Sequence, residues 1–548
     1  FREMRHLLKF IFLAAALAAF MVEARNPLLT PDRTPIRPQV GDADRHQPNR
    51  LFLERADSLM VTPWERDVQI LLGNVVFRKE DMFMYCDSAR FYTSPELPAD
   101  SMEAFGNIRM EQGDTLFLYG DYMEYSGSQE LVTVYGEGRD VRLINRDVTL
   151  TAPILHYSQL MQLGYYLNGG KLTDPQNELT SLEGEYAPPT KEANFYNHVR
   201  LTGRTNAGDT VRIFTDTLLY NTDTRIADLP VFARILGKDG DIDSRLGVYD
   251  TNLDLATLLN RSLVHTKRGN TLTGDSLIYD RSAGFGEAFG NMVLTDSARQ
   301  MTLEGDYGFY NELTDSAFCT GHARALEYSK PDTFYIHGDT LRTFVDPDSV
   351  RLMVANPNVR FWRVDLQGLC DSLTYVDTDT TVRMDYDPVV WNENYQVFGN
   401  RIILFMNDST VERAWLPDFG FLADEIEHGY YNQLSGKEMI AYFADGELSR
   451  LDVNGSVQAI MLPQEDDSTY NKIANIESSF MIAEFEGRDI KRVKLWDETS
   501  GTVTPLYLAK RSLFLLPKFK WLESERPTGP DDIFPRKLEV GEGDEVGD

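Results

Sequence analysis

The chain has 548 residues, with 54 Lys and Arg against 85 Asp and Glu, which gives a net charge of −31. A hydrophobic content of 42% and a charged content of 25% are typical of globular proteins and exclude a largely disordered chain. The negative charge argues against a nucleic-acid partner, because a phosphate backbone needs a basic surface. Three cysteines cannot form a disulfide framework, so burial of apolar side chains must hold the fold together.

Residues 1–24 have the pattern of a secretory signal peptide. A basic start is followed by an uncharged apolar run over residues 10–22, and Val22-Glu23-Ala24 offers a cleavage site after Ala24. The apolar run is short for a membrane span, and an uncleaved anchor is the alternative interpretation. We therefore expect an exported protein.

The rest of the chain divides by composition. Residues 25–50 are rich in Pro, Arg and Asp and are predicted to be a linker. From 51 to 395, short runs of alternating polarity are broken by Gly, Asn and Asp, which is typical of an all-β fold. Residues 396–522 continue this β pattern, and the Pro-, Gly- and acid-rich residues 523–548 are predicted to be a disordered acidic tail.

A first phrase, Gly-Asp-x-apolar-x-Tyr, recurs along the chain, for example at Gly120–Tyr125, Gly274–Tyr279 and Gly305–Tyr310. Together with weaker copies it forms an aromatic ladder with a period of about 32 residues. The ladder positions are Phe91, Tyr125, Tyr157, Tyr186, Tyr220, Tyr249, Tyr279, Tyr310, Thr343 and Tyr375. A period of this kind predicts a stack of small structural units.

A second phrase, Gly-Asn-apolar-x-apolar, lies between the ladder positions, at 73–77, 106–110 and 290–294. Both phrases have the two-residue period of a strand, and Gly-Asn and Gly-Asp are turn dipeptides that adopt positive φ easily. Each unit is thus a few short strands joined by tight turns. One unit cannot bury its apolar face alone, so we expect the units to stack into one long β-structure on the order of 100 Å long.

These phrases resemble the repeat of the OstA-like, LptA-type family of periplasmic lipopolysaccharide-transport proteins. The best matches are Gly73–Phe77 with Asp87–Tyr92, and Gly106–Met110 with Asp121–Tyr125. Residues 436–455 and Phe519-Lys520-Trp521 are similar to the large OstA-like proteins of Bacteroidetes-type bacteria.

The resemblance implies an elongated open β-jellyroll, shaped like a taco shell, with the acyl chains of lipopolysaccharide in its apolar groove. It implies a periplasmic, non-enzymatic bridge protein, either free or associated with the outer membrane. Its expected partners are an inner-membrane extraction complex and an outer-membrane β-barrel translocon, and end-to-end self-association is a further expectation.

The inward residues of the two phrases are the candidates for lining that groove. They are Val75, Phe77, Ile108, Met110, Met123, Tyr125, Leu218, Tyr220, Leu277, Tyr279, Met292, Leu294 and Tyr310. A continuous apolar surface would suit acyl chains, since each buried CH₂ contributes about 0.8 kcal/mol. A ladder tyrosine could equally fill a closed core between two sheets.

Other residue patterns favour structural roles. The aspartate that opens each ladder strand is expected to cap a turn by accepting backbone N–H bonds, not to bind metal. Cys86 and Cys370 replace glycine in their repeats, so we expect small buried residues there. Residues 239–243 look like a calcium loop, but the required Gly and the closing Glu are missing.

We find no motif of a hydrolase, kinase or metalloprotease in the sequence, and we predict no catalytic residue, metal or cofactor. Two other functions stay open. One is a secreted β-solenoid adhesin or structural protein, and the other is a β-helical polysaccharide-active enzyme, whose carboxylates would be hidden among 85 acidic residues.

Overall fold

The computed structural model describes residues 51–534, except 63–64, 93–98, 408–409, 428, 445–446, 466–468 and 488. The predicted signal peptide (1–24), the linker (25–50) and residues 535–548 of the predicted tail lie outside the described residues. Within them the chain forms 46 strands in one antiparallel sheet, and three single-turn 3-10 helices. No helix in this part of the chain is long and apolar enough to cross a membrane. The prediction of an all-β fold is confirmed.

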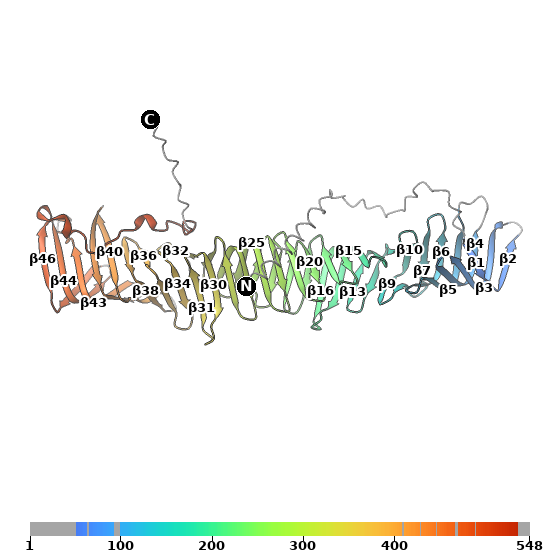
Figure 1. Cartoon of the computed structure of the whole chain (residues 1–548), viewed down its shortest axis with the longest axis horizontal. Helices are drawn as coiled ribbons and strands as arrows, with labels where there is room; N and C mark the ends of the chain where they lie inside the picture. The colour runs from blue at the N-terminus through green and yellow to red at the C-terminus, as the bar shows by residue number, and fades with distance from the viewer. Residues whose placement is uncertain are drawn as a thin grey trace, which may run out of the picture.

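The sheet is folded over into two facing walls, whose strands pile up along one axis into an elongated jellyroll (Figure 1). Long strands run through both walls. They are β3 (Glu65–Lys79), β4 (Met82–Tyr92), β5 (Ser101–Gln112), β6 (Leu116–Ser126), β15 (Glu192–Arg204), β16 (Thr210–Asn221), β25 (Phe285–Asp296), β26 (Met301–Asn311), β43 (Glu447–Met461) and β44 (Lys472–Glu486).

The shorter strands belong to one wall each. Wall A contains β2 (Ser58–Thr62), β7 (Leu131–Tyr135), β10 (Ile154–Ser158), β11 (Leu163–Tyr166), β14 (Glu183–Ala187), β17 (Ile226–Leu229), β20 (Leu246–Asp250), β21 (Leu255–Leu259), β24 (Ser276–Asp280), β27 (Ser316–Thr320), β30 (Thr340–Val345), β31 (Arg351–Asn356), β34 (Ser372–Val376), β35 (Thr381–Asp385), β38 (Arg401–Met406), β39 (Val411–Leu416), β42 (Glu438–Ala444) and β45 (Asp489–Trp496). Wall B contains β1 (Phe52–Arg55), β8 (Val141–Asn145), β9 (Val148–Ala152), β12 (Gly170–Thr173), β13 (Asn177–Ser181), β18 (Ala233–Leu236), β19 (Gly240–Ser244), β22 (Leu263–Thr266), β23 (Thr271–Thr273), β28 (Arg324–Glu327), β29 (Phe334–His337), β32 (Val359–Arg363), β33 (Leu366–Cys370), β36 (Val389–Asn392), β37 (Tyr395–Gly399), β40 (Gly420–Glu427), β41 (Tyr430–Gly436) and β46 (Ser500–Pro505).

The pairing of β6 shows how one sheet becomes two walls. Its second half, Tyr122–Ser126, pairs with β7, whereas its first half, Leu116–Tyr119, pairs with β8. The same branching occurs at β16 and at β26, and the two walls rejoin at β15, β25 and β43. The walls are thus continuous along one long edge, which we call the corner. The opposite edge, made of the hairpin turns of both walls, is the lip.

The Gly-Asn phrase forms the corner. Gly290 has φ 69° and Asn291 has φ 47°, and the pairing of β25 with β26 shifts register between Phe289 and Met292. Two successive residues with positive φ make a bulge that turns the strand from one wall into the other. Gly73-Asn74 and Gly106-Asn107 have the same geometry.

The aspartate of the Gly-Asp phrase binds this corner. The Nδ2 amide of Asn291 donates to Asp275 at 2.8 Å, and that of Asn107 donates to Asp87 at 2.8 Å. The sequence predicts that these aspartates accept backbone N–H bonds. Asp121 does so, from the N–H of Glu137 at 2.8 Å, whereas Asp275 and Asp87 accept from the side chain of the neighbouring corner. The two phrases are therefore two halves of one interaction that recurs along the corner.

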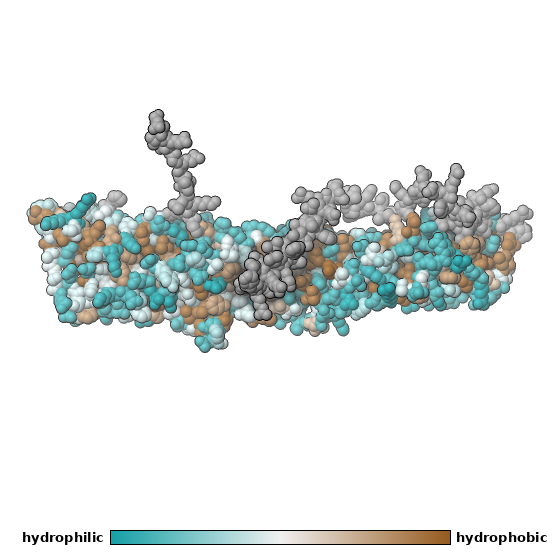
Figure 2. All heavy atoms as spheres, in the orientation of Figure 1, coloured by the Kyte–Doolittle hydropathy of each residue, from teal (hydrophilic) through white to brown (hydrophobic). Residues whose placement is uncertain are grey.

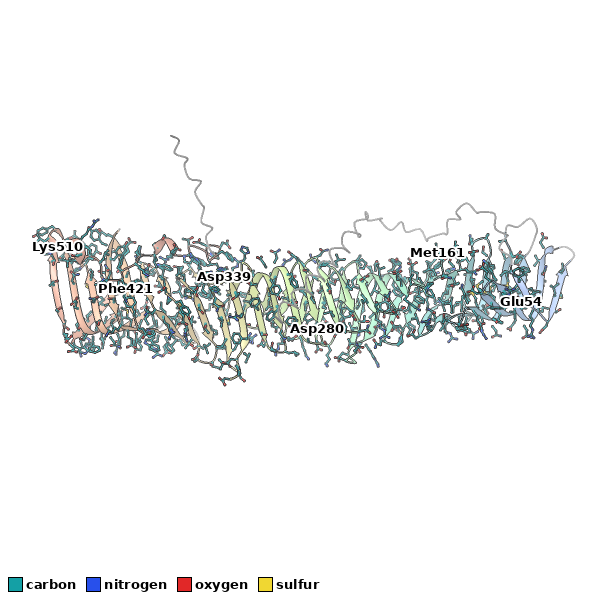
Figure 3. All side chains as sticks on the ribbon, viewed as in Figure 1. Glu54, Met161, Asp280, Asp339, Phe421 and Lys510 are labelled. Carbon is teal, nitrogen blue, oxygen red and sulfur yellow. The ribbon has the colours of Figure 1, made fainter. Side chains whose placement is uncertain are left out.

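The structure gives the ladder period a physical meaning. Tyr220 lies on β16, Tyr249 on β20 and Tyr279 on β24, and wall A has the strand order β16–β17–β20–β21–β24. One period therefore adds two strands to wall A, while β18, β19, β22 and β23 extend wall B in step. With strands about 4.8 Å apart, the whole pile is on the order of 100 Å long. In Figure 3, Glu54 and Lys510 mark its opposite ends.

One apolar core fills the space between the walls. Its buried members form a single connected cluster that runs from Leu51 to Ala483. Two smaller clusters lie on the outer face of wall B, around Trp391 and around Ile460. The pairing continues without interruption past residue 395, since β35 pairs with β38 and β37 with β40.

The C-terminal segment after the last strand packs back along the molecule. It includes the 3-10 helices η1 (Leu506–Leu508), η2 (Arg511–Leu513) and η3 (Glu523–Glu525), and it returns along wall B from β46 towards β32 (Figure 1). The tail was expected to begin at residue 523, but packing continues further, because Ile533 is completely buried. The ring of Phe534 packs against His337 and lies under Arg324, both on wall B, and composition alone does not show such contacts.

Candidate functional site

The candidate groove residues all point into the space between the walls. All thirteen (Val75, Phe77, Ile108, Met110, Met123, Tyr125, Leu218, Tyr220, Leu277, Tyr279, Met292, Leu294 and Tyr310) are only 0–5% exposed and belong to the main core cluster. A side chain with no accessible surface has no space beside it for even a water-sized probe. In this part of the molecule the ladder tyrosines therefore fill a closed core between the two walls and do not line an open groove.

The packing changes after about residue 330. The apolar side chains that contact the main core but stay partly exposed are, apart from Ala56, all in the C-terminal part: Phe334, Leu366, Val382, Val390, Val397, Leu404, Leu422, Ala441, Ala459, Met481 and Phe485. Their neighbours nearest the corner, such as Met384 and Ile402, are 0–2% exposed. The walls therefore stay packed at the corner but leave their interior partly accessible nearer the lip. We call residues 75–319 the closed segment and residues 334–485 the open segment.

Tyrosine hydroxyls of wall A bond across the lip of the closed segment to the polar ends of wall B strands. Tyr157 donates to Oε1 of Gln112 at 2.7 Å, and the Nδ2 amide of Asn145 donates to the hydroxyl of Tyr186 at 2.9 Å. Asn177 donates to Tyr220 at 2.8 Å, and Asn270 donates to Tyr310 at 2.9 Å. Because wall A supplies every tyrosine and wall B every amide, these bonds hold the two lips together. We call this set of bonds the latch.

Burial makes the latch hydroxyls firmly neutral. It raises the pKa of Tyr157, Tyr186 and Tyr310, and at Tyr220 the nearby Asp174 carboxylate raises the pKa further. The hydroxyl of Tyr220 also donates to Asp174 in the wall B hairpin. A neutral hydroxyl can both donate and accept a hydrogen bond. A wall A tyrosine can therefore donate to a side-chain carbonyl of wall B, as Tyr157 does, or accept from a side-chain N–H, as Tyr186 does.

Ion pairs add to the latch at its two ends. Nζ of Lys79, at the lip end of β3, lies 3.1 Å from Glu130 in the β6–β7 hairpin, and Lys79 is only 3% exposed. At the other end, Nη1 of Arg268 lies 3.2 Å from Asp315, and the backbone N–H of Arg268 donates to Glu312 at 3.0 Å. Lys79 is a buried charge that is stable only when paired, so its contact with Glu130 depends on the walls staying together. Arg268 is about half exposed, so its contact with Asp315 contributes less.

The ladder stops making this bond after Tyr310. The next ladder position is Thr343, which has no long side chain to reach the opposite wall. The following one, Tyr375, donates its hydroxyl to Asp377 of its own wall at 3.4 Å. The end of the tyrosine–amide bonds thus coincides with the start of the open segment.

The outer face of wall B in the open segment is covered by residues 506–534, which we call the strap. Its Leu516, Phe519, Trp521 and Leu522 pack on the outer cluster around Trp391, the largest fully buried side chain of the described chain. Phe421, labelled in Figure 3, belongs to the same cluster and is completely buried. The strap therefore closes the outside of wall B where the inside is partly open.

Four side-chain amides of wall B hold the strap backbone or its arginine. Gln396 donates to the carbonyl of Lys520 at 2.7 Å and accepts from the N–H of Leu522 at 2.8 Å. Gln433 makes the same pair of bonds with Phe514 and Leu516. Asn475 donates to Leu513, and Gln367 accepts from Arg526 at 2.6 Å.

These amides lie in one row across the strands. Each residue of this row is the pairing partner of the next residue, on the adjacent strand. The row consists of Asn475, Ile460, Gln433, Ala423, Gln396, Trp391 and Gln367. Every second position of the row is thus an amide, and we call the four amides the amide row.

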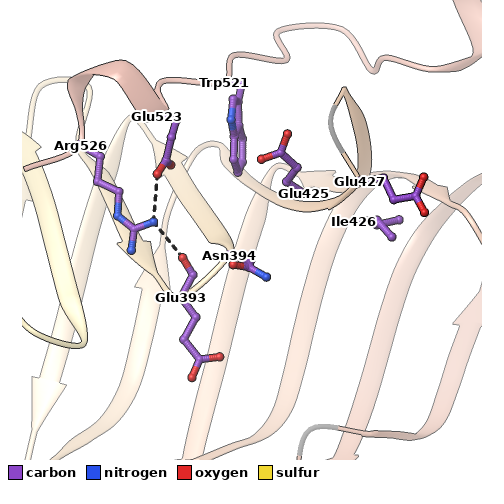
Figure 4. A pocket seen from close by; sticks show the side chains of 8 residues that line it. All are labelled: Glu393, Asn394, Glu425, Ile426, Glu427, Trp521, Glu523 and Arg526. Atoms are coloured by element: carbon purple, nitrogen blue, oxygen red, sulfur yellow. Dashed lines mark hydrogen bonds and ion pairs between the residues drawn. The ribbon is translucent and has the colours of Figure 1, made fainter. Parts of the chain in front are cut away.

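A cavity of about 290 Å³ lies where the strap passes the lip end of wall B (Figure 4). It is lined by Glu393, Asn394, Glu425, Ile426, Glu427, Trp521, Glu523 and Arg526. Arg526 donates to the carbonyl of Glu393 at 2.9 Å and lies 3.3 Å from Glu523. Four carboxylates make this cavity a poor place for hydrocarbon.

The remaining sequence candidates have structural surroundings. Cys86, Cys319 and Cys370 are buried free thiols, and burial raises the pKa of each to about 12. In the stretch that resembles a calcium loop, Asp239 lies 3.6 Å from Lys267 and Asp243 lies 3.7 Å from Arg234. Two of the three carboxylates of this stretch therefore face basic side chains of the protein.

Both ends of the pile present edge strands with exposed apolar side chains, seen as brown spheres in Figure 2. At the N-terminal end, Phe52 is 57% and Val61 is 50% exposed, and β1 and β2 each pair with β3 on one side. At the C-terminal end, Val503 on β46 is 64% exposed and Ile490 on β45 is 49% exposed. Such edges can accept a further strand.

Comparison with known proteins bears on the N-terminal part. The family model described as OstA-like protein matches residues 48–207. Among solved structures, the chain is similar to LptH of Pseudomonas aeruginosa, described as the LptA-homologous periplasmic component of a lipopolysaccharide transport device. That likeness has 16% identity, covers 22% of this chain and 84% of LptH, and has a TM-score of 0.19, too low to support an argument about this fold. No curated protein sequence matches the chain.

Proposed function

We propose that this chain, whose residues 48–207 match the family model described as OstA-like protein, is a periplasmic, non-enzymatic bridge for lipopolysaccharide on its way to the outer membrane. The acyl chains of the lipid lie between the two walls, and the sugars and phosphates stay outside the lip. The chain contributes a long apolar interior and no chemistry.

The partly exposed interior of the open segment carries this proposal. There, apolar side chains of both walls, such as Leu404 of wall A and Val397 of wall B, are exposed to solvent on faces that pack against the core. Each methylene group that moves from water to such a surface contributes about 0.8 kcal/mol, so a single acyl chain would be held by several kcal/mol. Apolar surface of this kind is unfavourable in water, and it is typical of sites that a ligand or partner covers.

The closed segment sets a condition on the proposal. Its interior side chains leave no room for an acyl chain beside them, so lipid passes through this part only when the lips separate. The corner, made of backbone bulges and Asn–Asp bonds, would serve as the hinge of such a movement.

The free strand edges at both ends suggest how the bridge is completed. Strand addition at β1 and β2, or at β45 and β46, would join the walls to those of another jellyroll and continue the apolar interior. We propose an inner-membrane extraction complex and an outer-membrane β-barrel translocon as the partners at the two ends, with end-to-end self-association as a means of extending the bridge.

Photo-crosslinking tests the proposal. A benzophenone amino acid at Leu404, which faces the interior, should crosslink to lipopolysaccharide in cells, whereas the same group at Ile403, on the opposite face of β38, should not. Mass spectrometry of lipid bound to the purified protein checks the same point independently. Crosslinks at Ile403 without crosslinks at Leu404, and a protein free of lipid, would refute the proposal.

A structural or adhesive role is the second candidate, and the packed closed segment favours it. A spacer needs a continuous core and no ligand, which is the arrangement found from Val75 to Cys319. A protein that purifies without lipid and binds a cell-surface polymer would support this alternative.

A further inference from the structure

The contacts at the lip differ between the closed and the open segment. In the closed segment, a row of polar bonds joins the walls at the edge where they would otherwise be free. In the open segment, the ladder positions no longer supply this bond, and the interior becomes partly exposed. These two changes occur at the same place in the chain.

We infer that the latch is a conformational device that keeps the closed segment shut, so that hydrocarbon chains enter the molecule in the open segment and advance only as latch bonds part. The inference rests on the proposed function for its ligand, but the latch itself is a property of the protein alone. It assigns to the ladder tyrosines the role of positioning the two walls, and not of lining a permanent groove.

The geometry of the latch supports a movable closure. At Tyr157, Tyr186 and Tyr310 the latch is one hydrogen bond between neutral groups, at the outer limit of the core, and only Tyr220 bonds to a carboxylate as well. Individual bonds of this kind contribute little on balance, so they can break one at a time while their neighbours hold. By contrast, the corner is held by the backbone itself, which continues from wall to wall through the bulges of β15 and β25.

Two buried hydroxyls without hydrogen-bond partners also support a movable closure. Tyr125 and Tyr279 are buried ladder residues whose hydroxyls have no hydrogen-bond partner in the structure. Tyr125 lies beneath the Lys79–Glu130 ion pair, with Nζ of Lys79 at 5.8 Å from its ring centre. An unsatisfied buried hydroxyl is unfavourable, so opening the lip at these positions would give it access to water. These two ladder positions are the weak points of the latch.

Distance measurements between spin labels test the latch in the full chain. Labels on Asp114 and Met161 report on the closed lip, since they flank the Gln112–Tyr157 bond on exposed hairpins of walls B and A. Labels on Val364 and Asp379 report on the open lip in the same way. The three buried cysteines are replaced by alanine in all proteins, so that only the introduced positions carry a label.

The latch variant combines Tyr157→Phe, Tyr186→Phe and Tyr310→Phe, which removes three hydroxyls and keeps the rings. Tyr375→Phe is the matched control, because that ladder hydroxyl bonds within its own wall. We expect a narrow 114–161 distance distribution and a broad 364–379 distribution without ligand. The latch variant should broaden the 114–161 distribution, and the control should leave both unchanged. Equal widths at the two lips, or no broadening in the latch variant, would overturn the latch.

Purified lipopolysaccharide then tests the entry site. We expect it to shift the 364–379 distance in every protein, and to shift the 114–161 distance in the latch variant well before the unmodified chain. A shift at 114–161 in the unmodified chain without a shift at 364–379 would overturn the assigned entry site. If lipopolysaccharide shifts neither distance while the latch variant still differs without ligand, the proposed function fails and the latch stands.

Discussion

The side-chain amide of Gln396 binds the backbone of Lys520, which lies 124 residues later in the chain, at 2.7 Å. Gln396 is completely buried, and it also accepts the N–H of Leu522, so its amide acts as one residue of an additional strand for the strap. Gln433 repeats this contact closer to the C-terminal end of the pile. The strap is therefore fixed by its backbone at regular places, which leaves its side chains to pack on Trp391 and its neighbours.

Replacing Gln396 by leucine should release the middle of the strap. The substitution keeps an apolar body but leaves the carbonyl of Lys520 and the N–H of Leu522 without partners, at a cost of about 1–3 kcal/mol for each group that stays buried. The strap will avoid this cost by detaching locally. We expect faster hydrogen exchange in residues 514–526 and trypsin cleavage at Lys518 or Lys520, while the exchange of the β25–β26 region stays unchanged.

Gln458→Leu provides the control, since Gln458 lies on β43 of the same wall and its amide bonds at 3.4 Å to Glu477 at an exposed position. It should leave the strap as protected as in the unmodified chain. Equal exchange in the Gln396→Leu and Gln458→Leu proteins would mean that apolar packing alone holds the strap.

The corner glycines should tolerate no side chain. A Cβ on Gly290 would come within 2.6 Å of Oδ2 of Asp275, and the residue has φ 69°. Gly113 also has a positive φ, of 60°, but a Cβ there would meet nothing within 4 Å. We expect Gly113→Ala to cost about 1 kcal/mol from backbone strain, and Gly290→Ala to cost clearly more, because the Asn291–Asp275 bond is also displaced.

Chemical denaturation of the two variants measures this difference. Adding Asp275→Ala to Gly290→Ala should recover part of the lost stability, because the contact that the new methyl group meets is then removed. If both glycine variants lose the same stability, the strain at the corner is a backbone property only, and the aspartate contact contributes nothing to it.

The three thiols should be inert in the folded protein. Cys319 is completely buried, and burial raises its pKa to about 12, so the reactive thiolate is almost absent at neutral pH. We expect a disulfide reagent to modify no cysteine in buffer and three cysteines in denaturant. Modification of Cys370 in buffer at the rate of a free thiol would show that the walls of the open segment separate as far as the corner.

Much of this architecture can be predicted from the sequence because it repeats. The Gly-Asn and Gly-Asp phrases mark the corner, the ladder gives the period, and the two-residue strand period puts Leu277 and Tyr279 on one face. A repeated local pattern is readable because each copy solves the same folding problem with the same residues. The thirteen candidate groove residues face the interior between the walls, but all of them lie in the closed segment and none in the open one, and their contact with lipid stays a prediction.

The latch and the strap were not predicted, for different reasons. Latch partners are 40 to 45 residues apart, as in Asn270–Tyr310 and Gln112–Tyr157. The sequence signal is therefore an amide at this distance before a ladder tyrosine, and only four of the described ladder tyrosines have one as a partner. The strap occurs once and contacts residues such as Gln396 more than 120 positions away. A single long-range contact leaves no period in the sequence, and the Pro- and acid-rich composition after residue 523 indicated disorder instead.

The end of the strap should respond to pH through His337. Its Nδ1–H donates to the carbonyl of Ala323 at 2.7 Å, and its ring packs against Phe534, with ring centres 4.9 Å apart. Burial lowers the pKa of His337, and the nearby Arg360 and His322 lower it further, against the opposing effects of the Ala323 carbonyl and Asp339. The neutral imidazole is therefore the form that fits the folded protein.

A histidine whose pKa is lower in the folded than in the unfolded state stabilises the fold fully above its unfolded pKa of about 6.5, and this stability is lost as the pH falls through the folded pKa. Below about pH 6.5, detachment of the strap end lets His337 take up a proton, which the packed imidazole would accept only as a buried charge against Phe534. We therefore expect hydrogen exchange in residues 527–534, corrected for the intrinsic effect of pH, to accelerate between pH 7 and pH 5, with little change at Gln396 and its strap partners. His337→Gln should remove this pH dependence, because glutamine does not titrate and can still donate to Ala323. A pH response that persists in His337→Gln would assign it to another group, and a response that spreads over the whole strap would show that its two ends open together.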